Sequence, residues 1–345
     1  MRAMIMNDGV LRVDEMADPV PEKGQVLVRT LACGVCASDI HLRSHGDRLA
    51  KWSREFGGPF DMDTKSDLVM GHEYCGEIVD YGPDTSGELA VGSRVTSMPQ
   101  LFHDRGFTVL GYDNVYPGGF SQYMLLGRDM LRAVPADVPT DAAALTEPLS
   151  VGFEYVRIAR MRPHDVPLVI GCGAIGLGMI AVLRDAGVSP IVAADYAPMK
   201  RALAEQMGAH VVVDPAEQSP MRAWTEAAAS TKSAAAVVFE CVGVPGTLGA
   251  ILEAAPWNAR VIVAGVCLEP DPVFGAAAHS KAINVQFGGI PIAADFDGAL
   301  EAISDGRIDV ASWITGHAGI EQSVSAFDEA TDPEQHARMI VHPHD

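Results

Sequence analysis

The sequence is poor in cysteine, carries far fewer basic than acidic residues, and has no long hydrophobic run. Six cysteines in 345 residues are too few for a disulfide framework. Lysine and arginine number 25 against 45 acidic residues, a formal net charge of -20, and they form no cluster. This excludes a basic nucleic-acid-binding surface and disfavours an anionic membrane partner. No apolar stretch could cross a bilayer and the N-terminus lacks signal-peptide features, so we expect a cytoplasmic protein.

What is present is typical of a folded chain of about two domains, with 48% hydrophobic and 20% charged residues. The first half is β-rich, because short alternating segments are separated by glycine and proline. The strands expected there are Gln25–Leu31, Glu77–Asp80, Ser93–Thr96 and Phe120–Leu125.

The pattern changes near residue 141. Asp141–Arg160 is alanine-rich and predicts one or two helices, and from Pro167 onward apolar strands alternate with helical stretches. That alternation indicates a parallel, doubly wound α/β sheet covered on both faces. We expect this domain at 151–289, inserted between two pieces, 1–150 and 290–345, of the β-rich domain. Ligands often bind between domains arranged in this way.

A glycine-rich turn follows the first strand of the α/β domain and opens a helix. It reads Gly171-Cys172-Gly173-Ala174-Ile175-Gly176, the G-x-G-x-x-G pattern. In that context the glycines permit a tight turn, a close approach to a pyrophosphate and helix–strand packing. The dinucleotide-binding residues predicted from this turn are Gly171, Gly173, Ala174, Ile175 and Gly176.

Asp195 lies at the end of the next strand, where a carboxylate accepts hydrogen bonds from the adenosine ribose. A carboxylate there repels the extra phosphate of NADP, so we expect NAD. Lys200 and Arg201 follow a few residues later, and their positive charges would allow some binding of NADP as well.

Three short motifs could together build a metal site. They are Cys33-Gly34-Val35-Cys36-Ala37-Ser38-Asp39-Ile40-His41, Gly71-His72-Glu73, and Glu147-Pro148-Leu149-Ser150-Val151. A cysteine, a histidine and a carboxylate with a fourth position open to water would make a catalytic zinc site. The residues alone equally allow a free thiol pair and a histidine on an unrelated turn.

The three motifs, with the glycine-rich turn after them in fixed order, resemble those of the medium-chain zinc-dependent alcohol dehydrogenases. The Glu-Pro-Leu-Ser-Val motif is similar to that of the sorbitol and polyol dehydrogenase branch. The resemblance covers essentially the whole chain and implies a GroES-like catalytic domain joined to a Rossmann domain. It also implies hydride transfer between an alcohol or polyol and NAD.

The resemblance further implies a role for each residue of the metal motifs. The family pattern selects Cys36 rather than Cys33 as a zinc ligand, with His72 and Glu147 as the other two. Glu73 would lie beside the zinc, as an occasional ligand or a carboxylate in the outer shell.

The neighbours of Cys36 have implied roles as well. Asp39 would orient His72, and Ser38 would bind the substrate hydroxyl and begin a proton relay. His41 is either an outer member of that relay or a surface histidine. The nicotinamide would lie near Val242, Gly243, Gly265 and Val266, and near the Gly288-Gly289 turn.

Three features depart from the family pattern. Met98–Gly119 holds no cysteine, so we expect one catalytic zinc per chain and no structural zinc. The segment from Leu42 to Met70 is expected to be a long loop, either capping the substrate pocket or lying on the surface. Glu154 stands where relatives often have a histidine.

The leading interpretation is thus an NAD-dependent, zinc-dependent alcohol or polyol dehydrogenase. Two alternatives are a zinc-free quinone or enone reductase of the same superfamily and a non-catalytic, nucleotide-binding redox sensor. The intact set of Cys36, His72 and Glu147 argues against the reductase. The resemblance also implies a homodimer or homotetramer, because an apolar edge strand such as the one expected at Ala282–Phe287 often pairs across a two-fold axis in relatives.

Overall fold

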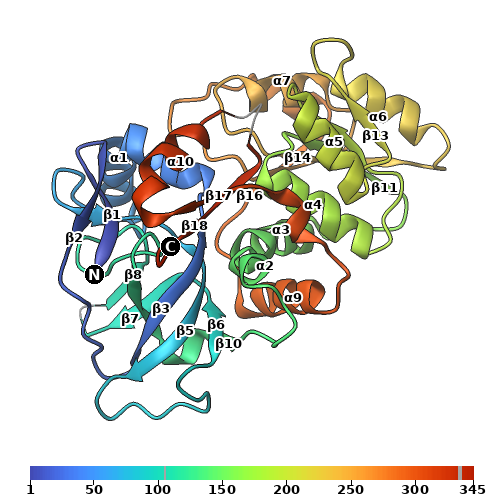
Figure 1. Cartoon of the computed structure of the whole chain (residues 1–345). Coiled ribbons are helices and arrows are strands. Elements are labelled where there is room, and N and C mark those ends of the chain that lie inside the picture. The colour runs from blue at the N-terminus through green and yellow to red at the C-terminus, as the bar shows by residue number, and fades with distance from the viewer. Residues whose placement is uncertain (105, 333–335) are drawn as a thin grey trace. The chain divides into compact units, whose positions relative to one another are not determined.

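The computed structural model describes residues 1–104, 106–332 and 336–345 (Figure 1). The chain forms two compact units. One contains Met1–Glu147 with Leu300–Asp345, and the other contains Pro148–Ala299. In the described part of the chain, no helix combines the length and the apolar character needed to cross a membrane.

The first unit is built mainly from antiparallel strands. Its larger sheet has the order β10-β6-β5-β3-β18-β17, and β9 also pairs with β3. A smaller sheet has the order β2-β1-β4, and β7 pairs with β8 as a hairpin. The strands are β1 (Arg2–Asn7), β2 (Val10–Glu15), β3 (Gln25–Gly34), β4 (Leu68–Val69), β5 (Glu73–Tyr81), β6 (Arg94–Ser97), β7 (Gln100–His103), β8 (Gly106–Val109), β9 (Tyr123–Gly127), β10 (Leu131–Ala133), β17 (Ile314–Gly319) and β18 (Arg338–His342).

The strands expected from the sequence occur, but their ends differ. β3 and β5 are longer than expected, and β5 begins at Glu73, which places a motif residue inside a strand. The strand expected at Phe120–Leu125 instead begins at Tyr123, because Phe120 and Ser121 bond to the neighbouring β1 region rather than to β3.

The segment expected to be a long loop after Leu42 is largely helical, so that expectation is wrong. Helix α1 runs over Ala37–Phe56, with a kink at His45 and an end at Gly57, whose φ is 74°. Leu42, Leu49 and Ala50 are buried on one side of this helix. Apolar residues at helical spacing therefore outweighed the polar composition that suggested a loop.

The remaining helices of the first unit are short, and the division between the units falls inside two further helices, α3 (Thr146–Ala159) and α9 (Ala293–Ser304). The short helices are α2 (Thr140–Ala144) and α10 (Ser323–Glu329), with 3-10 turns at Arg128–Met130, Val310–Trp313 and Ile320–Gln322. The helical segment expected at Asp141–Arg160 is thus two helices, α2 and α3, divided at Leu145.

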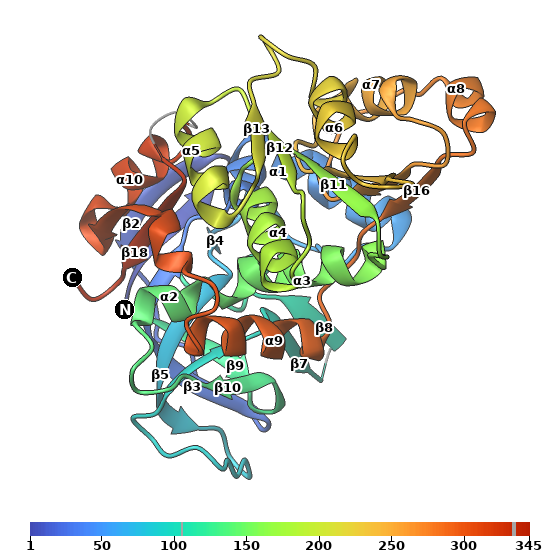
Figure 2. The same cartoon turned by 90° about the vertical axis from the view of Figure 1, so that its right-hand side faces the viewer.

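The second unit contains a parallel sheet with the order β13-β12-β11-β14-β15-β16. Its strands are β11 (Asp165–Ile170), β12 (Val192–Ala194), β13 (Val211–Val213), β14 (Ala235–Glu240), β15 (Arg260–Val263) and β16 (Asn284–Phe287). The order reverses between β12 and β14 on either side of β11, which is the doubly wound arrangement expected from the sequence. The helices between them, visible in Figure 2, are α4 (Ala174–Asp185), α5 (Pro198–Met207), α6 (Pro220–Ala228), α7 (Thr247–Ala254) and α8 (Gly275–Ser280).

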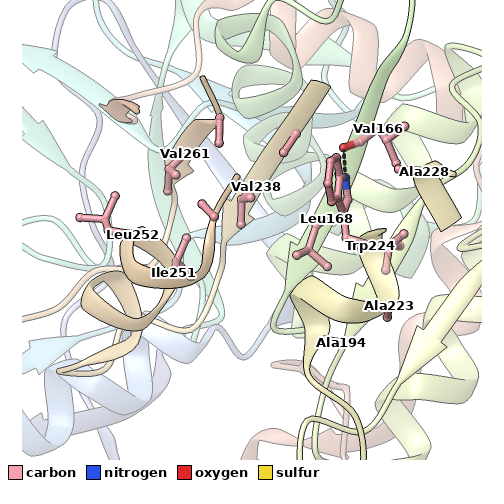
Figure 3. Packing of buried hydrophobic residues seen from close by; sticks show 14 of the residues in the cluster. Val166, Leu168, Ala194, Ala223, Trp224, Ala228, Val238, Ile251, Leu252 and Val261 are labelled. Atoms are coloured by element: carbon pink, nitrogen blue, oxygen red, sulfur yellow. Dashed lines mark hydrogen bonds between the residues drawn. The ribbon is translucent and has the colours of Figure 1, made fainter. Parts of the chain in front are cut away.

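One face of this sheet packs against α6 and α7 (Figure 3). Val166 and Leu168 of β11 point to that face, as their alternation along the strand requires. The Trp224 indole of α6 is buried there and donates a hydrogen bond to the Val166 carbonyl at 2.9 Å. This core holds the carboxyl ends of the strands in place, and ligands bind at such ends in parallel sheets.

Candidate active site

A cysteine, a histidine and a glutamate meet in the first unit. One ligand-capable atom from each of Cys36, His72 and Glu73 lies within 4.8 Å of the other two. His72 and Glu73 are buried, and Cys36 is partly exposed. Within the described residues, this is the group that could hold a metal ion.

Two glycines of the sequence motifs make room for this cluster. Gly34 pairs with Glu73 across β3 and β5, and a Cβ at Gly34 would lie 2.3 Å from Glu73 Oε2. Gly71 has a φ of 95°, which favours glycine, and a Cβ there would meet Cys33 Sγ at 2.8 Å. The motifs are therefore required for packing as well as for chemistry.

The first turn of α1 brings the expected neighbours of Cys36 to His72. Buried Asp39 accepts a hydrogen bond from the Cys36 amide at 3.0 Å, and its other oxygen lies 3.4 Å from His72 Nδ1. The Ser38 hydroxyl lies 3.3 Å from His72 Nε2. His41 is exposed one turn further along and stacks on His45, with ring centroids 6.4 Å apart.

A buried arginine completes the cluster. Arg338 of β18 donates from Nη1 to Glu73 Oε1 at 3.0 Å and to the Val35 carbonyl at 2.7 Å. Glu73 Oε2 lies 3.0 Å from the same Nη1 but has no hydrogen bond, and His72 Nδ1 has none either. Two buried polar atoms beside a thiol therefore lack hydrogen bonds, although such groups are normally satisfied.

The electrostatics favour a cation at this place. Burial lowers the pKa of His72, but the nearby Tyr112, Asp39 and Cys36 side chains raise it well above its usual value. Burial and the Glu73 charge raise the pKa of Cys36, so its thiolate needs a positive partner. A divalent ion would supply that charge, and a thiolate, an imidazole and a carboxylate are the ligand types that zinc takes. The residues present thus fit a zinc ion.

Glu147 lies outside the group of three, at the start of α3. Burial raises its pKa to about 7, with His72 lowering it and Glu73 raising it further. These contributions place Glu147 within electrostatic reach of the cluster. A carboxyl with such a pKa can accept or release a proton near neutrality.

The sequence did not indicate Tyr112, an aromatic side chain that lies beside the cluster. Buried Tyr112 packs on His72, with ring centroids 5.5 Å apart, and Phe60 packs on Tyr112 at 4.7 Å. Trp52 and Phe56, which lie with Phe60 in the segment from Leu42 to Met70, are 43% and 73% exposed. Only Phe60 of those three thus has a ring contact leading toward His72.

The second unit presents the glycine-rich turn between β11 and α4. Gly171 has a φ of 93°, and a Cβ at Gly176 would lie 1.9 Å from the Gly171 carbonyl oxygen. A Cβ at Gly173 would meet nothing within 4 Å, so the space over that residue is open. Ala174 and Ile175 begin α4, whose free N–H groups and dipole favour an anion.

Asp195 lies directly after β12, as expected. Its Oδ2 accepts from the Cys172 amide and its Oδ1 from the Ala197 amide, both at 2.8 Å, which fixes the carboxylate beside the glycine-rich turn. Arg201 of α5 donates to the Asp195 carbonyl at 2.9 Å and pairs with Asp214 at 2.9 Å. Lys200 precedes it on α5 and is half-buried.

The other residues expected at the cofactor follow β14 and β15. Val242 and Gly243 donate their amides to Glu240 Oε1 at 2.7 and 2.8 Å, and Glu240 itself is buried. Gly265 lies against Gly243, since a Cβ on Gly265 would be 2.2 Å from the Gly243 nitrogen, and Val266 is 71% exposed. Glu240 was not predicted, although a lone charge ending an apolar strand could have suggested it.

Comparisons with known proteins agree with this geometry. Residues 22–136 match the family model of the alcohol dehydrogenase GroES-like domain, and residues 174–305 match that of the zinc-binding dehydrogenases. Together these matches cover well over half of the chain.

Named relatives and solved structures extend the similarity to the rest of the chain. The (R,R)-butanediol dehydrogenase of Bacillus subtilis (strain 168) is 29% identical over 81% of this chain and 80% of its own. The sorbitol dehydrogenase of the same organism is 24% identical over 99% and 97%. A protein from Sinorhizobium meliloti 1021, whose structure is bound to NADP, superposes with a TM-score of 0.83 at 23% identity over 99% of both chains.

The fold, the cluster of Cys36, His72 and Glu73, and these matches agree on one family. The chain belongs to the zinc-type medium-chain alcohol dehydrogenases, in the branch of the polyol, sorbitol and butanediol dehydrogenases.

Proposed function

We propose that this enzyme interconverts an alcohol or polyol and its carbonyl compound, with NAD as the preferred hydride acceptor and one zinc ion per chain. The cluster of Cys36, His72 and Glu73 is the observation that carries the proposal. Relatives named as butanediol, sorbitol and erythritol/threitol dehydrogenases support small secondary alcohols and polyols as the substrate class.

Cys36, His72 and Glu73 would hold the zinc ion, since their ligand atoms are the ones brought together. When bound, zinc supplies Lewis acidity, which stabilises negative charge on an alcohol oxygen and polarises a carbonyl group. Asp39 orients the His72 ring from its other side, and Arg338 orients the Glu73 carboxylate. Glu147, which the family resemblance implies as the third ligand, lies outside this group of three, and with a pKa of about 7 it can exchange a proton beside them.

Ser38 is the group that we propose to take the substrate's hydroxyl proton. Its Oγ lies 3.3 Å from His72 Nε2, which places the hydroxyl next to the cluster. His41 lies three residues further along α1, on the same side of the helix. Partial burial and the neighbouring His45 lower the pKa of His41, which favours its neutral, proton-accepting form.

Two features support NAD over NADP. The Asp195 carboxylate is fixed where an adenosine ribose would bind and would repel a 2′-phosphate. The nearest guanidinium, that of Arg201, is already paired with Asp214. One solved structure of this fold is bound to NADP and another to NADH, so the proposed preference rests on these side chains rather than on the fold.

A steady-state assay tests the proposal. Secondary alcohols, polyols and aryl alcohols are offered with NAD and, in parallel, with NADP, and formation of the reduced cofactor is followed by absorbance at alkaline pH. Turnover of a diol or polyol with NAD, lost after chelation and restored by zinc, is expected. A preference for NADP would refute the cofactor assignment, and full activity of the metal-free protein would refute the zinc assignment.

We also propose a homo-oligomer that pairs through β16. This strand is the edge of the parallel sheet, and all its side chains are exposed, Phe287 by 65%. Exposed apolar edge strands readily pair with another chain. Light scattering after gel filtration should give a dimer or tetramer mass, and a monomer would refute this proposal.

A further inference from the structure

Glu154 of α3 is an acidic side chain that is hard to explain by stability. It is 3% exposed, and burial raises the pKa of its carboxyl, with the Asp295 charge raising and the Arg157 charge lowering it. One oxygen, Oε1, accepts a hydrogen bond from the Gly289 amide at 2.9 Å. The other, Oε2, is buried and lacks a hydrogen-bond partner. An unsatisfied buried carboxyl oxygen is costly, so another benefit must explain its retention.

The partner of Glu154 lies at the edge of the sheet where ligands bind. Gly288 and Gly289 directly follow β16, whose carboxyl end lies on the same edge as those of β11, β14 and β15, because these strands are parallel. The segment 288–292 has no regular structure, and Gly289 and Ile290 are exposed. The Gly289 amide could therefore be hydrated if Glu154 were absent.

Several contacts from α3 hold this segment. Besides the bond from Gly289 to Glu154, the Tyr155 ring fills the space beside Gly288, where a Cβ would lie 2.0 Å from Tyr155 Cε1. At the far end, Arg157 makes two hydrogen bonds to Asp295, at 2.8 and 2.7 Å, and Asp295 accepts from the Ile292 amide at 3.0 Å. Side chains from a single turn of one helix thus fix both ends of an exposed loop.

We propose that Glu154 is a positioning residue for the nicotinamide end of the cofactor: its carboxyl group holds the Gly289 amide and so fixes the 288–292 backbone for ligand binding. The inference rests on the proposed nicotinamide cofactor. A single hydrogen bond to an exposed loop adds little to the stability of the fold, but it fixes the position of the loop. We therefore attribute the burial of Glu154 to ligand binding rather than to stability.

The experiment compares two variants in otherwise intact enzyme. Glu154→Gln keeps a side-chain carbonyl that can accept from Gly289, whereas Glu154→Leu removes the acceptor at similar volume. NADH binding is measured by fluorescence titration, with NADPH in parallel, and urea unfolding midpoints are measured on the same samples. Hydrogen exchange of peptides covering 288–292 reports on the loop directly.

The expected result separates binding from stability. Glu154→Leu should weaken NADH binding about 10-fold or more, the scale of one lost hydrogen bond to a carboxylate, and should speed exchange in 288–292. Its unfolding midpoint should be unchanged or higher, because an unsatisfied buried oxygen has been removed. Glu154→Gln should restore most of the affinity and the protection.

Asp165→Asn is the matched control. Asp165 is also a buried carboxylate of this unit, paired with Arg260, but it lies at the opposite, amino end of the sheet. This variant should lower the unfolding midpoint and leave NADH affinity unchanged.

Unchanged NADH affinity in Glu154→Leu, or equal loss in Glu154→Leu and Glu154→Gln, would overturn the positioning role. If the wild-type enzyme itself bound neither NADH nor NADPH, the proposed cofactor would be wrong instead.

Discussion

Replacing the two neighbouring cysteines one at a time gives a sharp test of the proposed zinc site. Cys36 belongs to the group with His72 and Glu73, whereas Cys33 lies in β3, fully buried, with its Sγ near the Gly34 carbonyl at 3.7 Å. We expect Cys36→Ser to abolish zinc retention and Cys33→Ser to preserve it. The two changes are chemically identical, so each serves as the control for the other.

The structure also sets the sizes of the two effects. Removing a residue that hydrogen-bonds to a metal ligand typically lowers metal affinity about 10- to 100-fold. Removing the Cys36 thiolate, a ligand itself, should lower zinc affinity by more than that. Cys33→Ser instead places a hydroxyl among close neighbours, since a Cβ on Gly119 would lie only 2.6 Å from its Sγ. Burying that hydroxyl without a well-placed acceptor should lower the free energy of unfolding by about 1–3 kcal/mol.

Zinc per chain is measured by elemental analysis after dialysis, and stability by urea unfolding. Wild type and Cys33→Ser should hold about one zinc per chain, and Cys36→Ser close to none. Zinc loss in Cys33→Ser with retention in Cys36→Ser would refute the ligand assignment. Two zinc ions per wild-type chain would refute the expectation that no structural zinc is bound.

Three further predictions concern the cofactor, the proton and pH. Asp195→Ala should weaken NAD binding by about 1–3 kcal/mol. It should also reduce the difference in affinity between NAD and NADP, as measured by the two dissociation constants. Ser38→Ala should lower kcat roughly 10²–10⁴-fold with zinc content unchanged, and full activity would exclude Ser38 from proton transfer. Asp141 accepts hydrogen bonds from His342 at 2.8 Å and from His317 at 3.0 Å. The bond to Asp141 raises the pKa of His342, and although burial raises the pKa of Asp141, the two histidines lower it overall. The His342 contribution to stability is therefore complete below its unfolded pKa of about 6.5 and lost as the pH rises through its folded pKa, while that of Asp141 is lost only in acid. Asp141→Asn should thus cost on the order of 1 kcal/mol more at pH 5 than at pH 8.5 in urea unfolding, and an equal cost at both would contradict the ion pair.

The sequence predicted local features well, because they depend on residues close together in the chain. The strand, glycine-rich turn and helix around Gly171 follow from a short apolar run and three glycines. The polar segment after Leu42 was misjudged because its buried positions are spaced for a helix while most of its surface is charged. Burial against the rest of the first unit decides its structure, and that burial is a property of the fold.

Long-range partners of the site could not be predicted in this way. Arg338 lies 265 residues from Glu73, and the two meet only because β18 pairs with β3 and β3 pairs with β5. This pairing brings a guanidinium within 3.0 Å of both oxygens of Glu73, next to Cys36 and His72. The motifs contain no trace of this arrangement, so the resemblance to the family implied Glu147 as third ligand while the structure groups Glu73 with Cys36 and His72.

The motif glycines explain why such short patterns are nevertheless informative. At Gly34, Gly71 and Gly176 a side chain would collide with Glu73, Cys33 or the Gly171 carbonyl. At Gly173 a Cβ would have no neighbour within 4 Å, so open space is kept where a phosphate would approach. The first three glycines satisfy close packing and the fourth leaves room for a ligand. A short motif whose glycines are needed both for close packing and for ligand access is therefore more specific than its length suggests.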